Sequence, residues 1–268
     1  MCQGRAVLTV TSLLFATASC PSLALGGELL GSDAFTTGIG VIDRDTAEWT
    51  QVGYSGVLIT GLAYDSNHDI LYGISPNTDA LYEIDQYTGG ARVVGGPGNL
   101  GYGNANGLAY DPIDNILYGT DNNTNMLFTI DPATGVGTGV AQIGGFTEIE
   151  GLGFEPDQGI LYGITQLQRR IVEIDVRTGE AQAVSDQLPD LVWRGLDWDP
   201  EYRVLFASAV VMFDNARIYS FDPVNGRLDY RGDTVGIEAV QGLGFIPEPS
   251  AILLCLSVIP FALGRHRR

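Results

Sequence analysis

The pentapeptide GLAYD at residues 61–65 is the first of five related copies along this chain. Successive copies begin 44 to 47 residues apart. A nearly constant period of this size is typical of one supersecondary unit that is copied and stacked, so the chain is predicted to be a repeat protein. The later copies are GLAYD at 107–111, GLGFE at 151–155, GLDWD at 195–199 and GLGF at 242–245.

Each copy contains four short apolar runs that are separated by turn residues. Short runs rich in Tyr, Ile, Val and Phe, bounded by Asp, Asn, Pro and Gly, are typical of strands. No stretch shows apolar residues at helical spacing over three turns. Four strands in a repeat of this length match one blade of a β-propeller, for which ~40–50 residues are usual. In the second copy the runs cover residues 107–110, 116–119, 126–130 and, more weakly, 140–143.

Two incomplete copies at the ends of the array complete each other. Residues 28–43 align without a gap on residues 70–85, so the N-terminal segment supplies every strand of a blade except the first. Residues 240–246 supply a first strand with nothing after it. Sharing one blade would close the ring and leave no open sheet edge between the last blade and the first. The sequence therefore predicts an all-β fold over residues 27–246, a five-bladed β-propeller of four-stranded antiparallel blades.

The turn after the third strand of each copy also repeats. Four copies carry Asp at its start and Gly at its end, as in residues 85–89, and the glycine supplies the left-handed conformation that such a turn needs. In the first copy Ala47 replaces this glycine. We expect that turn to be strained or differently shaped.

The composition excludes several classes of partner and site. The chain has a formal charge of −18 and contains no lysine, so the body is expected to bind no nucleic acid. The acidity fits either solubility outside the cell or calcium binding by surface carboxylates. Cys2, Cys20 and Cys255 all lie outside residues 27–246, where His68 is the only histidine. We therefore expect no disulfide, thiol nucleophile or zinc site in the propeller.

Residues 1–26 have the pattern of a secretory signal peptide. Arg5 precedes an apolar run over residues 6–18, and Ala24-Leu25-Gly26 offers a cleavage site with small residues at its two ends. The run is too short to span a membrane. A lipoprotein signal centred on Cys20 is the alternative. Either interpretation predicts an exported protein.

Residues 247–268 form a tail with three features in a fixed order: Pro-Glu-Pro, an apolar stretch over residues 251–264, and a terminal arginine cluster. A helix of this apolar stretch would be ~21 Å long, shorter than the ~30 Å hydrocarbon core, so it predicts a transient or marginal membrane anchor. The residues that carry the pattern are Pro247, Glu248, Pro249, Arg265, Arg267 and Arg268.

This tail resembles the PEP-CTERM sorting signal of Gram-negative bacteria. The resemblance covers about 22 residues at the end of the chain. It implies recognition of the Pro-Glu-Pro motif by a membrane enzyme called exosortase, processing near that motif, and release to the cell surface or the extracellular matrix. Such proteins often accompany exopolysaccharide production.

The body of the chain resembles secreted NHL- and YVTN-like propellers, through a loose pattern of Gly-Leu-Ala-Tyr-Asp, Leu-Tyr-Gly, Ile-Asp and Thr-Gly. Those propellers include binding proteins and hydrolases, so this resemblance does not decide the function. The first hypothesis is an exported, non-enzymatic propeller that binds a matrix polymer or a surface protein. The second is a calcium-dependent, lactonase-like hydrolase with a carboxylate site at the channel mouth. The third is a purely structural surface protein.

One variable position of the repeat is the best candidate for a binding site. The first strand of each blade should lie innermost, and the residue before its repeated glycine is polar in all five copies but differs in each. We expect these five groups, with one added carboxylate, to gather at a mouth of the channel; ordinary strand-start residues are the alternative. No catalytic residue is assigned, and under the hydrolase hypothesis Asn106 or Glu150 would bind calcium. The predicted set is Thr60, Asn106, Glu150, Arg194, Asp197 and Gln241.

Aromatic residues at a second repeated position are expected to pack between blades, because they share one repeat position and fit a buried strand face. Trp49 and Trp193 fall outside this pattern, and the sequence predicts that they are freer to contact a partner. The repeated aromatic residues are Tyr64, Tyr110, Phe154, Trp198 and Phe245.

Overall fold

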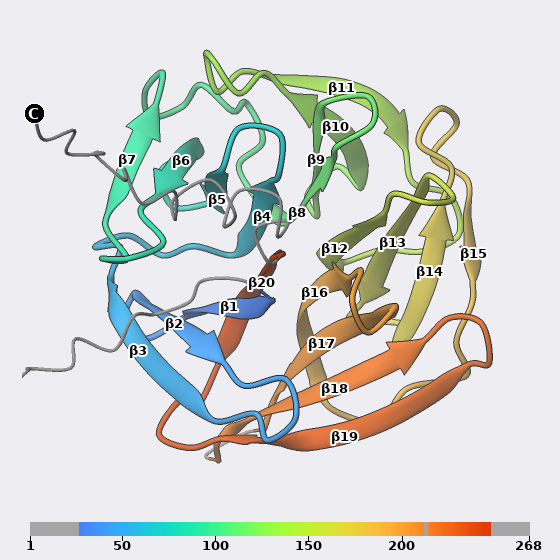
Figure 1. Cartoon of the computed structure of the whole chain (residues 1–268). Coiled ribbons are helices and arrows are strands. Elements are labelled where there is room, and N and C mark those ends of the chain that lie inside the picture. The colour runs from blue at the N-terminus through green and yellow to red at the C-terminus, as the bar shows by residue number, and fades with distance from the viewer. Residues whose placement is uncertain (1–26, 212–213, 248–268) are drawn as a thin grey trace, which may run out of the picture.

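The computed structural model describes residues 27–211 and 214–247, and these residues form twenty β-strands and no helix. The strands make five four-stranded sheets around a central axis, as Figure 1 shows. Paired strands within each sheet are antiparallel. The predicted five-bladed propeller is therefore confirmed. In the described part of the chain, no helix exists that could cross a membrane.

Four of the five blades are built from consecutive strands that run from the axis to the rim. Blade 1 contains β4 (Gly61–Asp65), β5 (Ile70–Ser75), β6 (Ala80–Ile84) and β7 (Ala91–Val94). Blade 2 contains β8 (Ala105–Asp111), β9 (Ile116–Asp121), β10 (Met126–Ile130) and β11 (Gly137–Gln142). Blade 3 contains β12 (Ile149–Glu155), β13 (Ile160–Thr165), β14 (Arg170–Ile174) and β15 (Ala181–Ala183). Blade 4 contains β16 (Val192–Asp199), β17 (Val204–Val210), β18 (Ala216–Asp222) and β19 (Arg227–Thr234).

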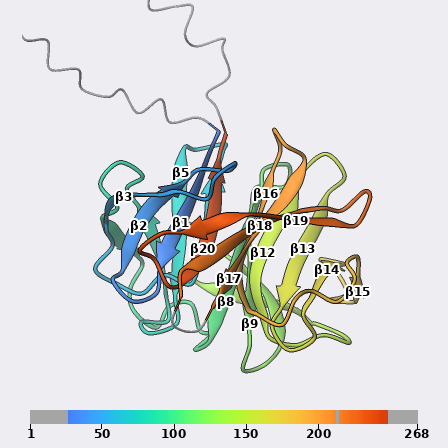
Figure 2. The ribbon, with the colours of Figure 1, turned by 90° about the horizontal axis from the view of Figure 1, so that it is seen from below.

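Blade 5 joins the two ends of the repeat array, as the sequence predicts. Its strand order is β20-β1-β2-β3, so the last strand of the chain is the innermost strand of a sheet begun by the first. Figure 2 shows β20 beside β1, and Glu28 at the start of β1 pairs with Ile246 at the end of β20. This shared sheet closes the ring. The strands are β20 (Val240–Ile246), β1 (Glu28–Asp33), β2 (Gly38–Ile42) and β3 (Trp49–Tyr54).

The hydrophobic core lies between neighbouring blades rather than within any one of them. Between blades 2 and 3, Tyr118 and Leu127 meet Phe154 and Leu161. Because side chains alternate along a strand, each sheet buries residues on both of its faces against the blades beside it. Packing between blades therefore holds the ring together, and it includes the aromatic residues for which the sequence predicts this position.

An ion pair fastens the N-terminal part of blade 5 to blade 4. Arg44 Nη1 lies 2.8 Å from Asp199 Oδ2 and 2.9 Å from Glu201 Oε2. The guanidinium carbon also stands 4.3 Å from the ring centre of Tyr202. Asp199 is fully buried, so this pair sits in a desolvated site where losing one partner is costly.

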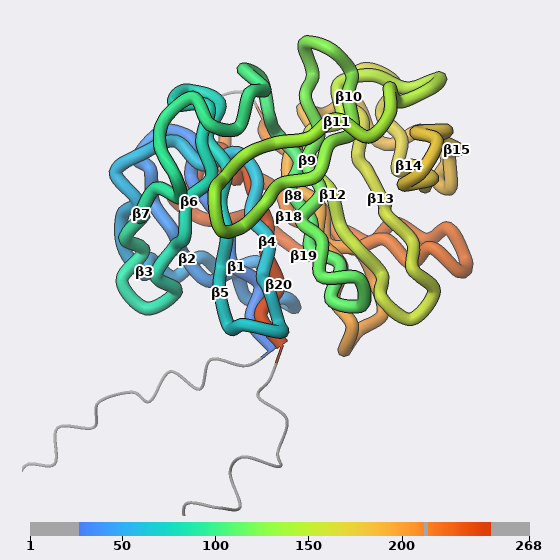
Figure 3. The backbone as a smooth tube through the Cα atoms, turned by 90° about the horizontal axis from the view of Figure 1, so that it is seen from above, coloured from blue at the N-terminus to red at the C-terminus, as the bar shows by residue number. Residues whose placement is uncertain are grey.

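The repeated glycines form a ring at which the inner strands contact each other backbone to backbone. A Cβ atom on Gly151 would stand 2.4 Å from Leu196 N and 2.6 Å from Arg194 O, and one on Gly61 would stand 2.4 Å from Asn106 O. No side chain fits at such distances, which explains why the repeat requires glycine there. Figure 3 shows the propeller from the side, with the inner strands β4, β8, β12 and β20 near its centre. The ring of close contacts separates the two mouths of the channel. We call Gly61, Gly107, Gly151, Gly195 and Gly242 the glycine ring.

Three buried hydroxyl groups hold the inner strands where their pairing shifts register. Ser208 Oγ accepts the backbone N–H of Gly195 at 2.8 Å and donates to the carbonyl of Val240 in the next blade at 2.8 Å. The hydroxyl therefore satisfies two buried backbone groups that the shifted pairing leaves free. In the same way, Ser32 Oγ accepts the N–H of Gly242 and donates to the carbonyl of Ile59. Thr120 Oγ1 accepts the N–H of Gly107 and donates to the carbonyl of Ile149.

The turn that contains Ala47 keeps the shape of its counterparts. Ala47 has a φ of 61°, close to the 72° of Gly89, and its N–H donates to Asp43 O at 2.8 Å, as Gly89 does to Asp85 at 2.7 Å. The expectation of a different shape is therefore wrong, while the left-handed alanine carries the expected backbone strain. The buried methyl group of Ala47 packs in the core between blades 4 and 5.

Candidate functional site

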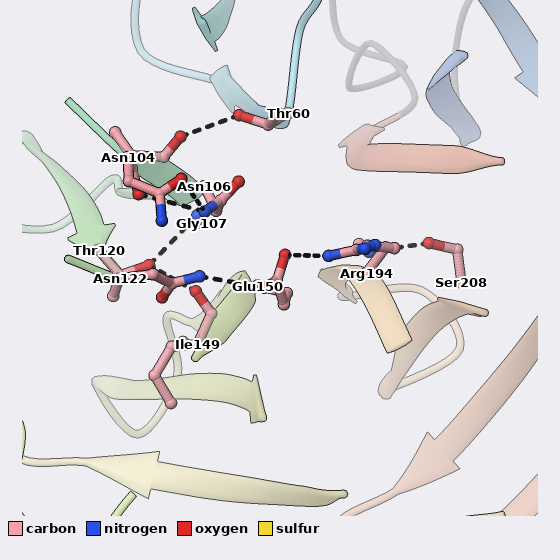
Figure 4. Close-up of polar contacts among 12 residues, drawn as sticks. Thr60, Asn104, Asn106, Gly107, Thr120, Asn122, Ile149, Glu150, Arg194 and Ser208 are labelled. Carbon is pink, nitrogen blue, oxygen red and sulfur yellow. Dashed lines mark hydrogen bonds and ion pairs between the residues drawn. The ribbon is translucent and has the colours of Figure 1, made fainter. Parts of the chain in front are cut away.

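The residues before the glycine ring lie at the mouth where all five inner strands begin, which we call the polar mouth. Thr60, Asn106 and Glu150 are buried, whereas Arg194 and Gln241 are partly exposed. Figure 4 shows four of the five around this end of the channel. The alternation of side chains along β4, β8, β12, β16 and β20 thus brings the variable position to one place.

A charged pair forms the centre of the polar mouth. Arg194 Nη1 lies 2.7 Å from Glu150 Oε2, and the Nδ2 group of Asn122 donates to Glu150 Oε1 at 3.0 Å (Figure 4). Burial raises the pKa of Glu150, and the neighbouring Arg194 and Asn122 oppose that rise. The guanidinium retains further donors beyond the one that Glu150 uses, so it can also hold an acceptor from a partner. Both charged residues were predicted from the sequence.

Thr60 and Asn106 bind backbone groups instead of one another. Thr60 Oγ1 donates to Ala105 O at 3.0 Å, which links blade 1 to blade 2, and Asn106 Nδ2 donates to Asn104 O at 3.1 Å. These hydrogen bonds stabilise the fold and also fix the two side chains at the polar mouth. Of the predicted set, only Glu150 and Arg194 form a direct side-chain pair.

Asn122 belongs to this site but was not predicted. It lies in the loop between β9 and β10, outside the inner strands on which the repeat alignment focuses. The only signal in the sequence is its place in the polar run DNNTN at 121–125, where turn formation accounts for the same composition.

Asp197 lies apart from the other predicted residues, at the opposite mouth. It stands three positions after Arg194, so at ~3.3 Å per strand residue it lies ~10 Å further along β16, beyond the glycine ring. It lines a cavity of about 80 Å³, which we call the aromatic mouth. The walls come from the ends of all five inner strands and the prolines beyond them. They are Tyr64, Ser66, Tyr110, Pro112, Phe154, Pro156, Trp198, Pro200, Phe245 and Pro247.

The repeated aromatic residues pack between blades, as predicted, and also form these walls. Phe154 stacks on Tyr118 of the preceding blade with ring centres 6.3 Å apart, and Trp198 stacks on Tyr162 at 6.4 Å. The prediction for Trp193 is wrong. Its side chain is fully buried in blade 4, 5.1 Å from the ring of Tyr219, because its position on β16 faces the interior rather than solvent.

The donor set at the polar mouth contains one carboxylate, and Arg194 and Asn122 already engage it. Within residues 27–211 and 214–247, no three side chains of His, Cys, Asp or Glu converge as a metal-binding group. His68 lies in the turn after β4, where its Nδ1 is 2.9 Å from Asp65 Oδ2. The mouth as it stands is therefore suited to polar and ionic recognition.

Comparisons with known proteins identify one family and the fold. A family model described as a repeat of unknown function (DUF6923) matches residues 39–200. No curated protein matches the chain. Three similar solved structures have identities of 12 to 18%, which shows a shared fold alone.

Three of these structures illustrate the range of propellers that share the fold. A chain in a crystal structure of a nidogen/laminin complex has a TM-score of 0.56 and 16% identity, covering 82% of this chain and 84% of that chain. A structural genomics protein of unknown function from Bacteroides thetaiotaomicron has a TM-score of 0.56 and 12% identity, covering 84% and 65%. A gluconolactonase from Xanthomonas campestris has a TM-score of 0.53 and 18% identity, covering 78% and 73%.

Proposed function

Because this chain belongs to the DUF6923 family of repeats and closes into a propeller with a polar mouth, we propose that it is an exported, non-enzymatic protein that binds a polymer or protein partner at the cell surface. The observation that carries the proposal is the Glu150–Arg194 pair at the polar mouth. One repeat position holds five different polar residues there, whereas the flanking positions repeat, which is the pattern expected of a recognition surface on a constant scaffold.

The chemistry of the pair favours recognition of a polar or charged partner. A carboxylate and a guanidinium held 2.7 Å apart present an acceptor and several donors on neighbouring blades. Exopolysaccharide and extracellular protein surfaces both offer complementary hydroxyl, carboxylate and amide groups. The nidogen structure, solved with laminin, gives a precedent for a propeller of this type in a protein complex.

Export and sorting complete the proposal. Residues 1–26 act as a signal peptide, and Pro247, Glu248 and Pro249 act as the recognition motif of a PEP-CTERM-like tail. The apolar stretch 251–264 and the arginines after it hold the chain transiently in the membrane of a Gram-negative bacterium. An exosortase-type enzyme then releases the propeller to the surface or matrix. Apart from Pro247, these residues lie outside the part of the chain that the structure describes.

The sorting proposal predicts a mass difference. Protein recovered from the surface of an exosortase-containing host should lack a C-terminal piece that begins near Pro247, and replacing Pro247, Glu248 and Pro249 with alanine should retain that piece. Intact mass spectrometry measures both. An exported wild-type protein that keeps residues 250–268 in full would contradict processing at this motif.

The second candidate is a calcium-dependent, lactonase-like hydrolase. Glu150, with a pKa raised by burial, lies beside Asn122, and oxygen ligands of this kind suit calcium. The gluconolactonase likeness is a likeness of fold. In this alternative the ion would have to displace Arg194 from Glu150, so treatment with a chelator would change binding or activity only if this candidate is correct.

The binding proposal predicts a clear effect of the charged pair. Replacing Glu150 and Arg194 together with alanine should weaken capture by exopolysaccharide or surface protein at least tenfold, because both the donor and the acceptor groups of the mouth are lost. The matched control replaces Asp157 and Arg203, an exposed pair 2.9 Å apart, and should leave binding unchanged. Pull-down with the folded full-length protein, with and without chelator, measures the effect. Equal capture by both double variants would overturn the proposal.

A further inference from the structure

The aromatic mouth combines features that the proposed function does not use. Its cavity of about 80 Å³ is large enough to hold several water molecules. The cavity lies at the ends of the inner strands, on the far side of the glycine ring from Glu150 and Arg194. It is therefore a separate site, and ligand binding there does not depend on recognition at the polar mouth.

The walls of this cavity are aromatic and held in place. Tyr64 Oη donates to Asp69 Oδ1 at 2.7 Å, and Tyr110 Oη donates to Asn115 Oδ1 at 2.6 Å. Phe154 and Trp198 are fixed by their stacking on tyrosine rings of the preceding blades. Such rings form a preorganised wall whose π-systems favour positive charge.

The floor of the cavity carries a single carboxylate. Asp197 Oδ2 accepts the N–H of Phe245 at 2.6 Å, and Oδ1 accepts the N–H of Trp198 at 2.8 Å. No Arg or His of the described residues forms an ion pair with it. The other four blades have alanine or glycine at this position, so the repeat itself does not require an acid here. These residues are Ala63, Ala109, Gly153 and Gly244.

No cationic side chain among the described residues compensates Asp197 when it is ionised. Asp199 lies two residues further along β16, but Arg44 binds it at 2.8 Å. The Arg44 guanidinium stands 5.3 Å from the ring centre of Phe245 and is engaged by Asp199 and Glu201. The tyrosine hydroxyl groups of Tyr64 and Tyr110 point to their own turns. Asp197 is therefore the single acidic side chain that the cavity lining presents to a ligand.

We propose that the aromatic mouth binds a small organic ammonium ion, with Asp197 as its counter-ion and the five aromatic residues as its walls. Aromatic cages are the usual site for methylated ammonium groups, and a carboxylate without a cationic partner supplies the specificity for charge. A free alkylammonium or the methylated end of a larger molecule presents the same group. Inorganic cations fit less well, because they need several oxygen ligands and the cavity offers one carboxylate.

Proton release should accompany this binding. Burial raises the pKa of Asp197 to about 8, although the N–H groups of Phe245 and Trp198 oppose the rise. At pH 6 the empty site therefore holds a proton, which an arriving cation must displace. Affinity should increase about tenfold per pH unit up to the pKa and become constant above it.

Choline and its neutral isostere 3,3-dimethylbutan-1-ol, titrated into the full-length protein, test the proposal. Isothermal calorimetry in buffers of different ionisation enthalpy gives both the dissociation constant and the number of protons released. We expect choline to bind, the neutral isostere to bind at least tenfold more weakly at pH 9, and nearly one proton to be released at pH 6. The Asp197→Asn variant, which is close in size and shape, should lose at least tenfold in choline affinity at pH 9 and should show no pH dependence.

Several outcomes would overturn the assignment. Equal affinity for choline and its neutral isostere would mean that shape alone is recognised, and absence of choline binding at 50 mM would remove the site. A choline affinity of the wild-type protein that does not change between pH 6 and pH 9 would exclude Asp197 as the counter-ion. This last measurement needs no variant, so it decides the matter even if Asp197→Asn does not fold. Failure of this site would leave the polar mouth unaffected, since Glu150 and Arg194 lie beyond the glycine ring.

Discussion

A chain that ends at Ala239 is expected to lose its cooperative fold. Deleting residues 240–268 removes β20, the innermost strand of blade 5, and leaves the inner edge of β1 open. At ~1.5–3 kcal/mol for each buried apolar side chain, the loss amounts to ~6–12 kcal/mol, which is comparable with the total stability of a domain. The buried apolar side chains of β20 are Val240, Leu243, Phe245 and Ile246.

The matched control for this deletion is a chain that ends at Pro247. It lacks the tail but retains β20, so it should unfold in one transition at the temperature of the full-length protein. Circular dichroism melting and size-exclusion chromatography distinguish the two truncations. A chain ending at Ala239 that stays monomeric and melts as the control does would show that the ring does not depend on the shared blade.

Replacing Gly151 with alanine is expected to destabilise the propeller by about 3 kcal/mol, at the upper end of the usual cost of overpacking. The added Cβ would stand 2.4 Å from Leu196 N, 2.6 Å from Arg194 O and 2.7 Å from Gly195 C. These are all backbone atoms, so no side chain can rotate away and β12 must separate from β16. At ~2–4 °C per kcal/mol for a domain of this size, the melting temperature should fall by ~6–12 °C.

Gly103 is the control for this substitution. It lies in a loop before β8, and a Cβ atom there would meet nothing within 4 Å. Gly103→Ala should therefore change stability by less than ~0.5 kcal/mol, as surface substitutions usually do. Thermal melts of the two variants side by side measure the difference. If Gly151→Ala melts within a degree of Gly103→Ala, the inner strands are not in close backbone contact at the glycine ring.

The repeat alignment predicts most, but not all, of the residues at the polar mouth. Five of them share one repeat position: Thr60, Asn106, Glu150, Arg194 and Gln241. The arrangement of five blades around an axis brings equivalent positions to one level, so the grouping of these residues could be predicted. Asn122 could not, because it comes from a loop whose path depends on packing. The direct Glu150–Arg194 pair likewise depends on which two blades are neighbours and on their side-chain conformations.

The aromatic mouth shows the opposite case. An aromatic residue at a repeated, alternating strand position is expected to be buried, and Phe154 and Trp198 are. The same residues also enclose a cavity, because the ends of all five inner strands meet around the axis beyond the glycine ring. The sequence places Asp197 with Arg194 as an added carboxylate at the channel mouth, yet the close backbone contact between the two positions puts them at different mouths.

The amino-acid sequence by itself determined the blade, the number of blades and the closure of the ring. Each of these follows from periodicity, turn residues and the fit of Glu28–Asp33 to a strand that β20 completes, and periodic patterns are local properties of a chain. Only the tertiary structure decided that the channel has two unlike ends, that Trp193 is buried, and that one carboxylate stands among aromatic rings. Those facts depend on distances between strands of different blades, which no single repeat encodes.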